Sequence, residues 1–399
     1  MKVVQINAVC GTGSTGRICT SIADVLDARG IENHILYSSG ECGQPNTHKF
    51  AEKGYTKFQS LKSRVLGNYG FNSRWETKKI LAHLDHIQPD IVHLHNIHGH
   101  DCHLEMLTDY LKKNHIKVFW TFHDCWAFTG YCTHFILEGC DKWQTGCGNC
   151  PQRARFSWLW DRSADNFRRK QEAFADLDLT IVTPSQWMAD LIGKSFLKDK
   201  PVRVIHNGID LNVFCPTSGR FRETHGIGPD TFLLLGVAAG WSNRKGMDVF
   251  CDLSQRLDRK KYRIVLVGTD ESVERQLPPG IIPVRRTNTP RELAEIYSAA
   301  DLFVNPTRED TYPTVNMEAI ACGTPVLTFR TGGSPEIVTE ETGCVVESND
   351  VDAMEREIIR ICSTKQYAAE AFMGRRKDFD KESCFSKYLE LYLAVYGRE

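Results

Sequence analysis

Short apolar segments rich in branched side chains alternate with helical patterns along most of the chain, and this alternation limits the fold more than any other feature. Strands that are buried on both faces of a parallel sheet have this composition. One series of segments precedes residue 210 and a second follows residue 230: KVVQIN, NHILYS, DIVHLH, KVFWTFH, LTIVTPS and VRVIHNG, then FLLLGVA, RIVLVG, IIPV, DLFVNP, PVLTF and GCVVE. The sequence therefore predicts an α/β protein with two Rossmann-like, doubly wound domains.

A polar linker rich in Gly and Pro, residues 210–231, separates the two series. At 399 residues the chain is also longer than one hydrophobic core usually serves. We predict an N-terminal domain over residues 1–210, a C-terminal domain over residues 211–380, and a helix in residues 381–399 that packs back on the N-terminal domain. The two domains are expected to face a cleft, because ligands of such folds bind at the carboxyl ends of the strands.

The charges nearly cancel, with 49 Lys and Arg against 50 Asp and Glu. This balance removes the main electrostatic argument for a nucleic-acid-binding protein. No apolar run approaches the 18 residues or so of a membrane span, and the start, MKVVQINAVCGTG, is too short and polar for a signal peptide. We therefore expect a cytoplasmic protein whose 15 cysteines are reduced, with any cysteine cluster serving a metal or catalysis.

Two loops have the composition of anion sites. GTGSTGR (11–17) follows the first strand and opens a helix, so the amides near Gly13 and Gly16 and the side chain of Arg17 can face an anion. WSNRKG places Arg244 and Lys245 where a helix begins, a position that normally favours acidic residues, so the two cations indicate an anionic ligand. A plain tight turn and a solvated charge pair are the respective alternatives.

The segment PTREDTYPTVNMEAIACGTPVLTF is the most informative stretch. It predicts a helix with Pro313 in its first turn, with Asp310 in the loop before it and Glu318 just over one turn inside it. Two carboxylates this close suit acid–base work or the binding of vicinal sugar hydroxyls. The alternative is a helix cap with a salt bridge to Arg308.

Together with VIHNGID (204–210) and TGGSPEIV (331–338), these segments resemble in order the retaining glycosyltransferases of family four, with their Glu-x7-Glu motif. The resemblance covers essentially the whole chain and implies the GT-B fold and a UDP- or GDP-sugar donor. It also implies that catalysis needs no cofactor and that the leaving diphosphate takes the acceptor's proton. More narrowly, the chain resembles bacterial enzymes that build capsule, exopolysaccharide and O-antigen chains.

The resemblance also implies roles for individual residues. Glu318 matches the family's glutamate that binds the ribose hydroxyls of the nucleotide. Asp310 matches the first carboxylate of the motif, which contacts the donor sugar. Lys245 matches the cation that binds the donor diphosphate. The family usually has an arginine at the position of Gly240 in this chain. Arg244 can take over the role of that arginine.

The amides of Thr314 and Val315 at the helix start can receive a phosphate. Pro313 stands where the family often has Gly, so one amide donor is lost there.

Histidines gather at the strand ends of the first domain. His123 follows KVFWTF, and the family has an equivalent histidine near the donor sugar. Its ring can donate a hydrogen bond to a sugar hydroxyl or a phosphate, and the alternative is a structural bond to a backbone carbonyl. His93 and His95 share a strand face compatible with a metal. We favour instead that some of these histidines line the acceptor side of the cleft.

Four cysteines fall within nineteen positions, Cys132, Cys140, Cys147 and Cys150. The final C-x2-C with two earlier cysteines suits a structural zinc site, and a metal would order a loop that lacks a periodic pattern. Free thiols and disulfides are the alternatives.

Between Lys49 and Lys79 the chain holds eight Lys or Arg against two Glu, a net of +6, with interleaved aromatic residues. Such a stretch can rest on an anionic membrane that presents a lipid-linked acceptor, at the inner face of the cell membrane. The alternative is a solvated helical face.

The favoured hypothesis is sugar transfer from a nucleotide-sugar to a glycan or lipid-linked acceptor. The alternatives are a nucleotide-sugar epimerase of GT-B shape and a binding module without turnover. A nicotinamide oxidoreductase is disfavoured, because no clean G-x-G-x-x-G is followed by an acidic residue about 20 positions on.

Overall fold

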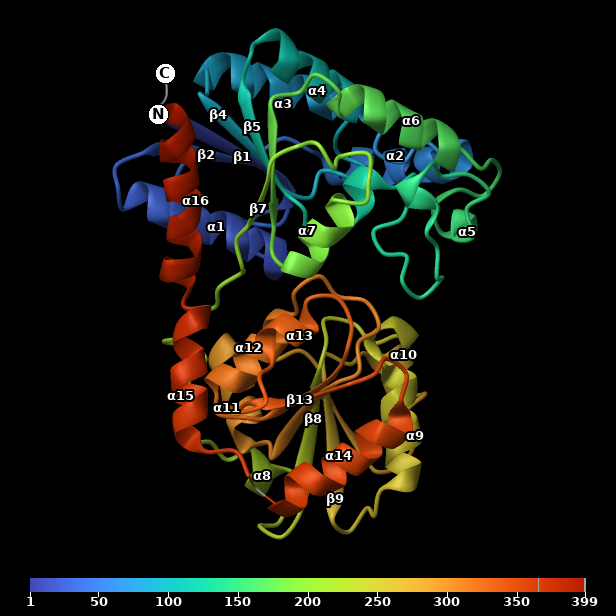
Figure 1. The fold of residues 1–399 in the computed structure, drawn as a ribbon, viewed down its shortest axis with the longest axis vertical. Coiled ribbons are helices and arrows are strands. Elements are labelled where there is room, and N and C mark those ends of the chain that lie inside the picture. Colours follow the sequence, from blue (N-terminus) through green and yellow to red (C-terminus); the bar gives the residue numbers. More distant parts are fainter. Residues whose placement is uncertain (365, 398–399) are drawn as a thin grey trace. The chain divides into compact units, whose positions relative to one another are not determined.

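The computed structural model describes residues 1–364 and 366–397. The chain forms two compact units (Figure 1). One comprises Met1–His206 and the C-terminal segment from Phe385, and the other comprises Asn207–Cys384. The chain thus changes unit after residue 206 and again after residue 384, against the predicted boundaries at 210 and 380.

Within the described residues, the first unit holds a seven-stranded parallel sheet in the order β3-β2-β1-β4-β5-β6-β7. The central strands are almost wholly buried, as their apolar sequences require. The sequence missed β3, because this three-residue edge strand is polar. The elements are β1(Lys2–Val9), α1(Gly13–Asp27), β2(Glu32–Ser39), β3(Thr47–Lys49), α2(Lys53–Leu66), α3(Arg74–Ile87), β4(Ile91–Leu94), α4(Leu104–Lys113), β5(Lys117–Thr121), η1(Trp126–Phe128), η2(Lys142–Gln144), α5(Arg153–Phe156), α6(Ser163–Phe174), β6(Leu179–Thr183), α7(Gln186–Ile192) and β7(Val202–Val204).

The second unit holds, among its described residues, a six-stranded parallel sheet in the order β10-β9-β8-β11-β12-β13. Its α11 begins with a local cap, because the Thr289 hydroxyl accepts from the Glu292 amide at 3.2 Å and Pro290 occupies the first turn. The elements are α8(Phe221–Thr224), β8(Phe232–Val237), η3(Asn243–Lys245), α9(Met247–Arg256), β9(Tyr262–Val267), α10(Glu271–Glu274), β10(Ile281–Val284), α11(Pro290–Ala299), β11(Leu302–Asn305), α12(Thr314–Ala321), β12(Val326–Phe329), α13(Ser334–Ile337), β13(Gly343–Val346), α14(Val351–Thr364), α15(Ala369–Arg376) and η4(Lys377–Phe379).

The last helix, α16(Lys381–Tyr396), packs on the first unit. Its apolar residues share one buried cluster with residues of β1, β5 and β6. The buried members on α16 are Phe385, Tyr388, Leu389 and Tyr392.

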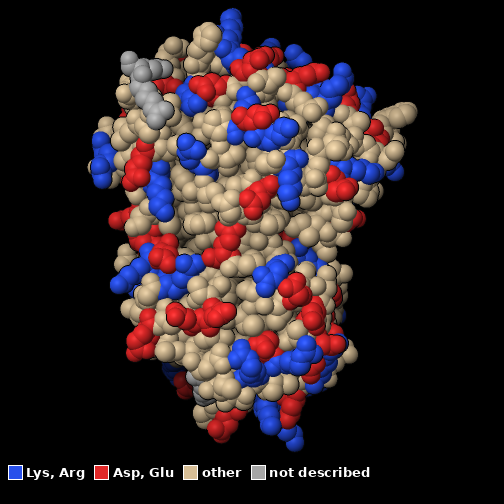
Figure 2. All heavy atoms as spheres, in the orientation of Figure 1, with Lys and Arg blue, Asp and Glu red and all other residues tan. Residues whose placement is uncertain are grey.

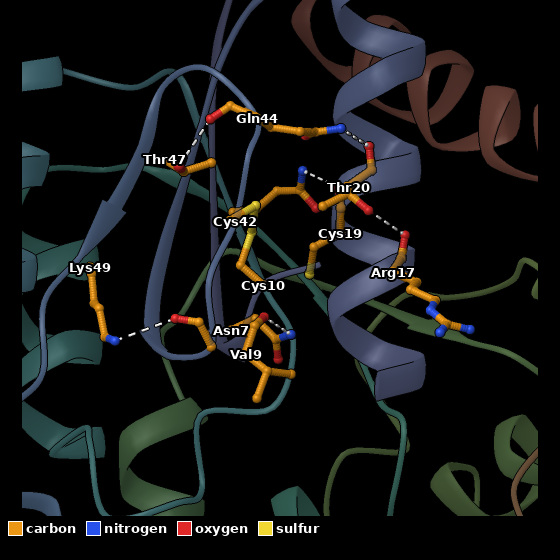
Figure 3. The surroundings of a disulfide bond; sticks show 12 residues. Asn7, Val9, Cys10, Arg17, Cys19, Thr20, Cys42, Gln44, Thr47 and Lys49 are labelled. Carbon is orange, nitrogen blue, oxygen red and sulfur yellow. Dashed lines mark hydrogen bonds between the residues drawn. A yellow bond between two sulfur atoms is a disulfide. The ribbon is translucent and has the colours of Figure 1, made fainter. Parts of the chain in front are cut away.

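A disulfide joins Cys10 and Cys42, with an S–S distance of 2.25 Å (Figure 3). The expectation that all cysteines are reduced is therefore wrong. The cause is the topology: Cys10 follows β1, Cys42 follows its neighbour β2, and the ends of these adjacent parallel strands bring the two Cα atoms to 5.5 Å.

Basic and acidic residues are mixed over the face shown in Figure 2, as the near-neutral composition requires. In the part of the chain that is described, every helix is too short or too polar to cross a bilayer.

Candidate functional site

The second unit brings together Lys245 and Asp310, which lie 65 positions apart in the sequence. Lys245 ends η3, Asp310 lies in the loop after β11, and the ammonium Nζ contacts the carboxylate Oδ2 at 2.6 Å. Each side chain is 22% exposed, so an anion that reaches the lysine competes directly with the carboxylate.

The TGGSPE segment lies against the backbone of this loop. Gly332 has φ +55°, and a Cβ there would overlap the main-chain carbonyl oxygen of Asp310. The next amide, of Gly333, donates to the carbonyl of Thr311 at 3.1 Å. Only glycine fits at this close approach, which explains how Gly332, 22 positions further along the sequence, fixes the position of Asp310.

The two arginines of this region hold the loops together. Arg244 donates from Nη1 to the Glu309 carbonyl at 3.1 Å. Arg308 donates to both carboxylate oxygens of Asp248 at 2.7 Å. Arg308 is thus paired with the first turn of α9, whereas the alternative interpretation of the acidic segment pairs it with a carboxylate of that segment.

Glu318 lies in α12 and is 8% exposed. The hydroxyl of Tyr297, which α11 contributes, donates to Glu318 Oε2 at 3.0 Å. Burial and the neighbouring carboxylate raise the pKa of Tyr297 well above its usual value, so this tyrosine remains a proton donor. Tyr297 was not predicted as a site residue, although its three-residue spacing from Ala294 on an amphipathic helix marks it as core-facing.

The start of α12 differs slightly from the prediction. Pro313 precedes the first turn instead of belonging to it, and the helix begins at Thr314. The amides of Thr314 and Val315 therefore belong to the first turn and have no acceptor within the helix. They lie in the same unit as the Lys245–Asp310 pair and Glu318.

In the first unit, α1 begins at Gly13 with no acidic residue in its first turn. Gly16 is buried against the strand end, and its carbonyl accepts from the Gly11 amide at 3.2 Å. Arg17 is exposed, and Figure 3 shows its side chain directed away from the disulfide. The loop is thus a tight turn with an exposed cation. This geometry is compatible with both interpretations of the sequence, an anion site and a plain tight turn.

Histidines from neighbouring strands contact one another at the carboxyl ends of β4 and β5. His95 Nδ1 lies 3.0 Å from His123 Nε2, and His95 Nε2 lies 3.1 Å from Gln5 Oε1. His93 contacts the Thr121 hydroxyl at 2.8 Å and the Tyr392 hydroxyl at 2.5 Å. His93 and His95 are thus hydrogen-bonded by polar side chains of the fold, among them Gln5, which the sequence did not predict as a site residue.

Burial controls the charge of these rings. It lowers the pKa of His93 to about 3 and that of His123 to about 4, and it lowers the pKa of His95 well below its usual value. All three imidazoles are therefore neutral at pH 7.

Asp124, next to His123, is ionised. Burial alone would raise its pKa, but His98, whose Nε2 contacts Asp124 Oδ2 at 2.7 Å, lowers it to about 2. Tyr69 contacts the other nitrogen of His98 at 3.0 Å. Asp124 therefore keeps its negative charge beside His123 and is held by the ring of His98.

The four clustered cysteines are free thiols. Burial raises the pKa of Cys132 to about 12 and of Cys147 to about 11, and in each case the neighbouring Cys150 adds to the rise. The four thiols thus share one region of the first unit. Across residues 1–364 and 366–397, no group of three or more His, Cys, Asp or Glu side chains is arranged to hold a metal ion.

Comparisons with known proteins match both halves of the chain. Residues 15–213 match the family described as Glycosyltransferase Family 4, and residues 230–364 match Glycosyl transferases group 1. A protein of Escherichia coli (strain K12), named as a colanic acid biosynthesis glycosyl transferase, WcaC, is 23% identical in an alignment of 383 positions that covers 88% of each chain.

Solved structures share the fold over the whole length. The sucrose-phosphate synthase of Thermosynechococcus elongatus superposes with a TM-score of 0.72 at 16% identity, covering 100% of both chains. Anabaena Alr3699/HepE, solved in complex with UDP and glucose, gives 0.69 at 14% identity and covers 99% of this chain and 100% of its own. The predicted two-domain architecture is confirmed.

Proposed function

Because the chain belongs to the glycosyltransferases of family 4 and group 1, with the GT-B fold, we propose that it moves a sugar from a nucleotide-sugar to a glycan or lipid-linked acceptor, with retention of anomeric configuration. The observation that carries the proposal is the Lys245–Asp310 pair, in the unit that also contains Glu318 and the start of α12. Its place is the synthesis of a bacterial surface polysaccharide, as the name of the Escherichia coli relative supports.

In this proposal the second unit binds the donor. Glu318 accepts from the ribose hydroxyls, while Lys245, Arg244 and the first amides of α12 hold the diphosphate, so the positive groups of the chain serve in place of a metal. Asp310 accepts from a hydroxyl of the sugar. The bond between the anomeric carbon and the diphosphate oxygen breaks, the acceptor oxygen bonds on the same face, and its proton passes to the leaving diphosphate.

A panel of nucleotide-sugars tests this proposal. The true donor raises the melting temperature by mass action and, with water or an acceptor, releases the nucleoside diphosphate. An epimerase would return an isomerised nucleotide-sugar, and a binding module would return the donor unchanged. Retention is checked by the anomeric signal of the product in NMR.

We expect Glu318→Ala to weaken binding of the donor nucleotide by about 1.5–3 kcal/mol, because it removes charged hydrogen bonds to the ribose. Tyr297→Phe, which removes only the bond that holds the carboxylate, should cost less. Calorimetry measures both, with the exposed Glu340→Ala as the control. An unchanged affinity in Glu318→Ala would exclude the ribose role.

We propose that the lipid-linked acceptor is met at the inner face of an anionic membrane. Helix α2 and the segment around Trp158, which both carry apolar and basic side chains, contact each other in the first unit. The Trp158 amide donates to the Arg64 carbonyl at 2.6 Å, and the Arg64 guanidinium lies 5.9 Å from the Trp158 ring centre. Phe58 and Leu61 on α2 and the run Trp158–Trp160 are more than half exposed. Cosedimentation with anionic vesicles should fall when Trp158 and Trp160 are changed to Ser, and equal binding would exclude this surface.

We also propose that one structural zinc is bound by Cys132, Cys140, Cys147 and Cys150. Binding requires the loop to change conformation so that the four sulfur atoms come within coordination distance of one ion. Lys170 supports the proposal: its buried Nζ donates to the carbonyls of Trp126 and Thr129 at 2.6 and 2.8 Å. Burial lowers the pKa of this lysine to about 7, although the nearby Cys147 and Cys132 act to raise it. Zinc with four thiolates carries two negative charges and would balance the buried ammonium. The amide of Gly130 already donates to the Cys147 sulfur at 3.2 Å.

Freshly purified protein should therefore carry about one zinc per chain, which Cys147→Ser or Cys150→Ser removes and Cys344→Ser, in the second unit, leaves in place. Elemental analysis measures the ratio. Metal-free protein prepared without chelators would reject the zinc site.

A further inference from the structure

Gln5, His95 and His123 form a chain of hydrogen bonds across three adjacent strands. Gln5 lies in the middle of β1, His95 directly after β4, and His123 two residues after the end of β5. The contacts are 3.1 Å between Gln5 and His95 and 3.0 Å between His95 and His123, and the two imidazole planes are 14° apart. Gln5 and His95 are almost fully buried, so water has little access to these contacts.

The chemistry of Gln5 sets the direction of every proton in this chain. Its Nε2 donates to the Cys19 carbonyl at 3.0 Å, and a carbonyl can only accept. The other end of the amide, Oε1, therefore faces His95 and must itself accept, so the proton lies on His95 Nε2.

A neutral imidazole carries one proton, so His95 Nδ1 is then an acceptor. The proton between the two rings consequently belongs to His123 Nε2. The opposite polarity would require His95 to be an imidazolium. Its burial and the His93 ring, whose centre lies 4.1 Å from that of His95, oppose this charge.

We propose that Gln5 and His95 are positioning residues for sugar transfer, which fix the ring of His123 with its proton on Nε2 and its Nδ1 as the acceptor nitrogen. The inference rests on the proposed function, in which His123 contacts the donor sugar. It also revises the expectation that His123 donates to a hydroxyl or a phosphate. An acceptor nitrogen pairs with a sugar hydroxyl, whereas an ionised phosphate oxygen has no proton to offer.

The first test needs no activity. In protein labelled with 15N-histidine, NMR should place the His123 proton on Nε2 and detect a nitrogen–nitrogen coupling through the hydrogen bond to His95 Nδ1. Gln5→Met, which keeps the volume and removes both hydrogen bonds, should weaken this coupling. Thr121→Val is the matched control, since it removes a buried hydrogen bond from His93 on the same wall. A shared proton on His95 Nδ1 in the wild-type protein would overturn the proposal.

The second test separates positioning from structure. Gln5→Met should lower kcat by roughly 10–100-fold, by analogy with the loss of a partner that orients a metal-ligating histidine. KM for the donor and affinity for the nucleoside diphosphate should stay within about twofold, and Thr121→Val should transfer at the wild-type rate. A normal kcat in folded Gln5→Met, or an equal loss in Thr121→Val, would refute the positioning role. If wild-type protein transfers no sugar, the proposed function and this role both fall, while the coupling still reports on the hydrogen bonds.

Discussion

His123→Ala is expected to lower turnover by roughly 10²–10⁴-fold, the usual scale for a positioned polar group. His123 belongs to the first unit, whereas the residues proposed to bind the nucleotide belong to the second. An interaction realised mainly in the transition state affects the rate more than the affinity. Binding of the bare nucleoside diphosphate should therefore stay almost unchanged.

Steady-state transfer kinetics and calorimetry on the same protein preparations provide this comparison. His86→Ala is a suitable control, because His86 is an exposed histidine on α3 of the same unit. Two outcomes would make His123 a structural residue: transfer at close to the wild-type rate, or a loss of nucleotide binding that parallels the loss of turnover.

Local patterns in the sequence account for much of this molecule. The buried strands follow from continuous apolar runs, and the start of α11 follows from Thr289, Pro290 and Glu292, because these features depend on neighbours in the chain. The acidic segment also indicated Asp310 and Glu318 by their spacing around the start of a helix.

Partners from distant segments were not predictable in this way. The pairing of Asp310 with Lys245, and of Arg308 with Asp248, depends on which strands become neighbours in the second sheet. The disulfide of Cys10 likewise depends on the adjacency of β1 and β2. Gln5 left one local signal, a polar residue inside an apolar strand, but its function depends on His95, 90 positions away.

Acid is expected to destabilise the first unit well before the carboxylates titrate. His93 and His95 are buried and neutral in the folded state, where the pKa of His93 is about 3 and that of His95 is well below its usual value. In the unfolded chain both have pKa values near 6.5. Below about pH 6.5 the unfolded state therefore binds more protons, and the free energy of unfolding falls as the pH falls.

His93 should cost roughly 2 kcal/mol at pH 5 relative to pH 7, and His95 acts in the same direction. Glu76 and Asp101 act in the opposite direction, because burial raises the pKa of each carboxyl and protonation then favours the folded state. Asp124, with a pKa of about 2, contributes only below about pH 4. The histidines should dominate between pH 6.5 and 5, since an unfolded histidine titrates near pH 6.5 whereas unfolded Asp and Glu titrate near pH 4.

Urea unfolding at pH 7, 6 and 5 measures this dependence. His93→Gln should flatten the slope by up to about 1.4 kcal/mol per pH unit, because it removes one titrating group, whereas His86→Ala should leave the slope unchanged. A wild-type free energy of unfolding that is equal at pH 7 and pH 5 would contradict the prediction. It would mean that the histidine chain takes up protons while folded, and the proton order derived for Gln5, His95 and His123 could not hold under those conditions.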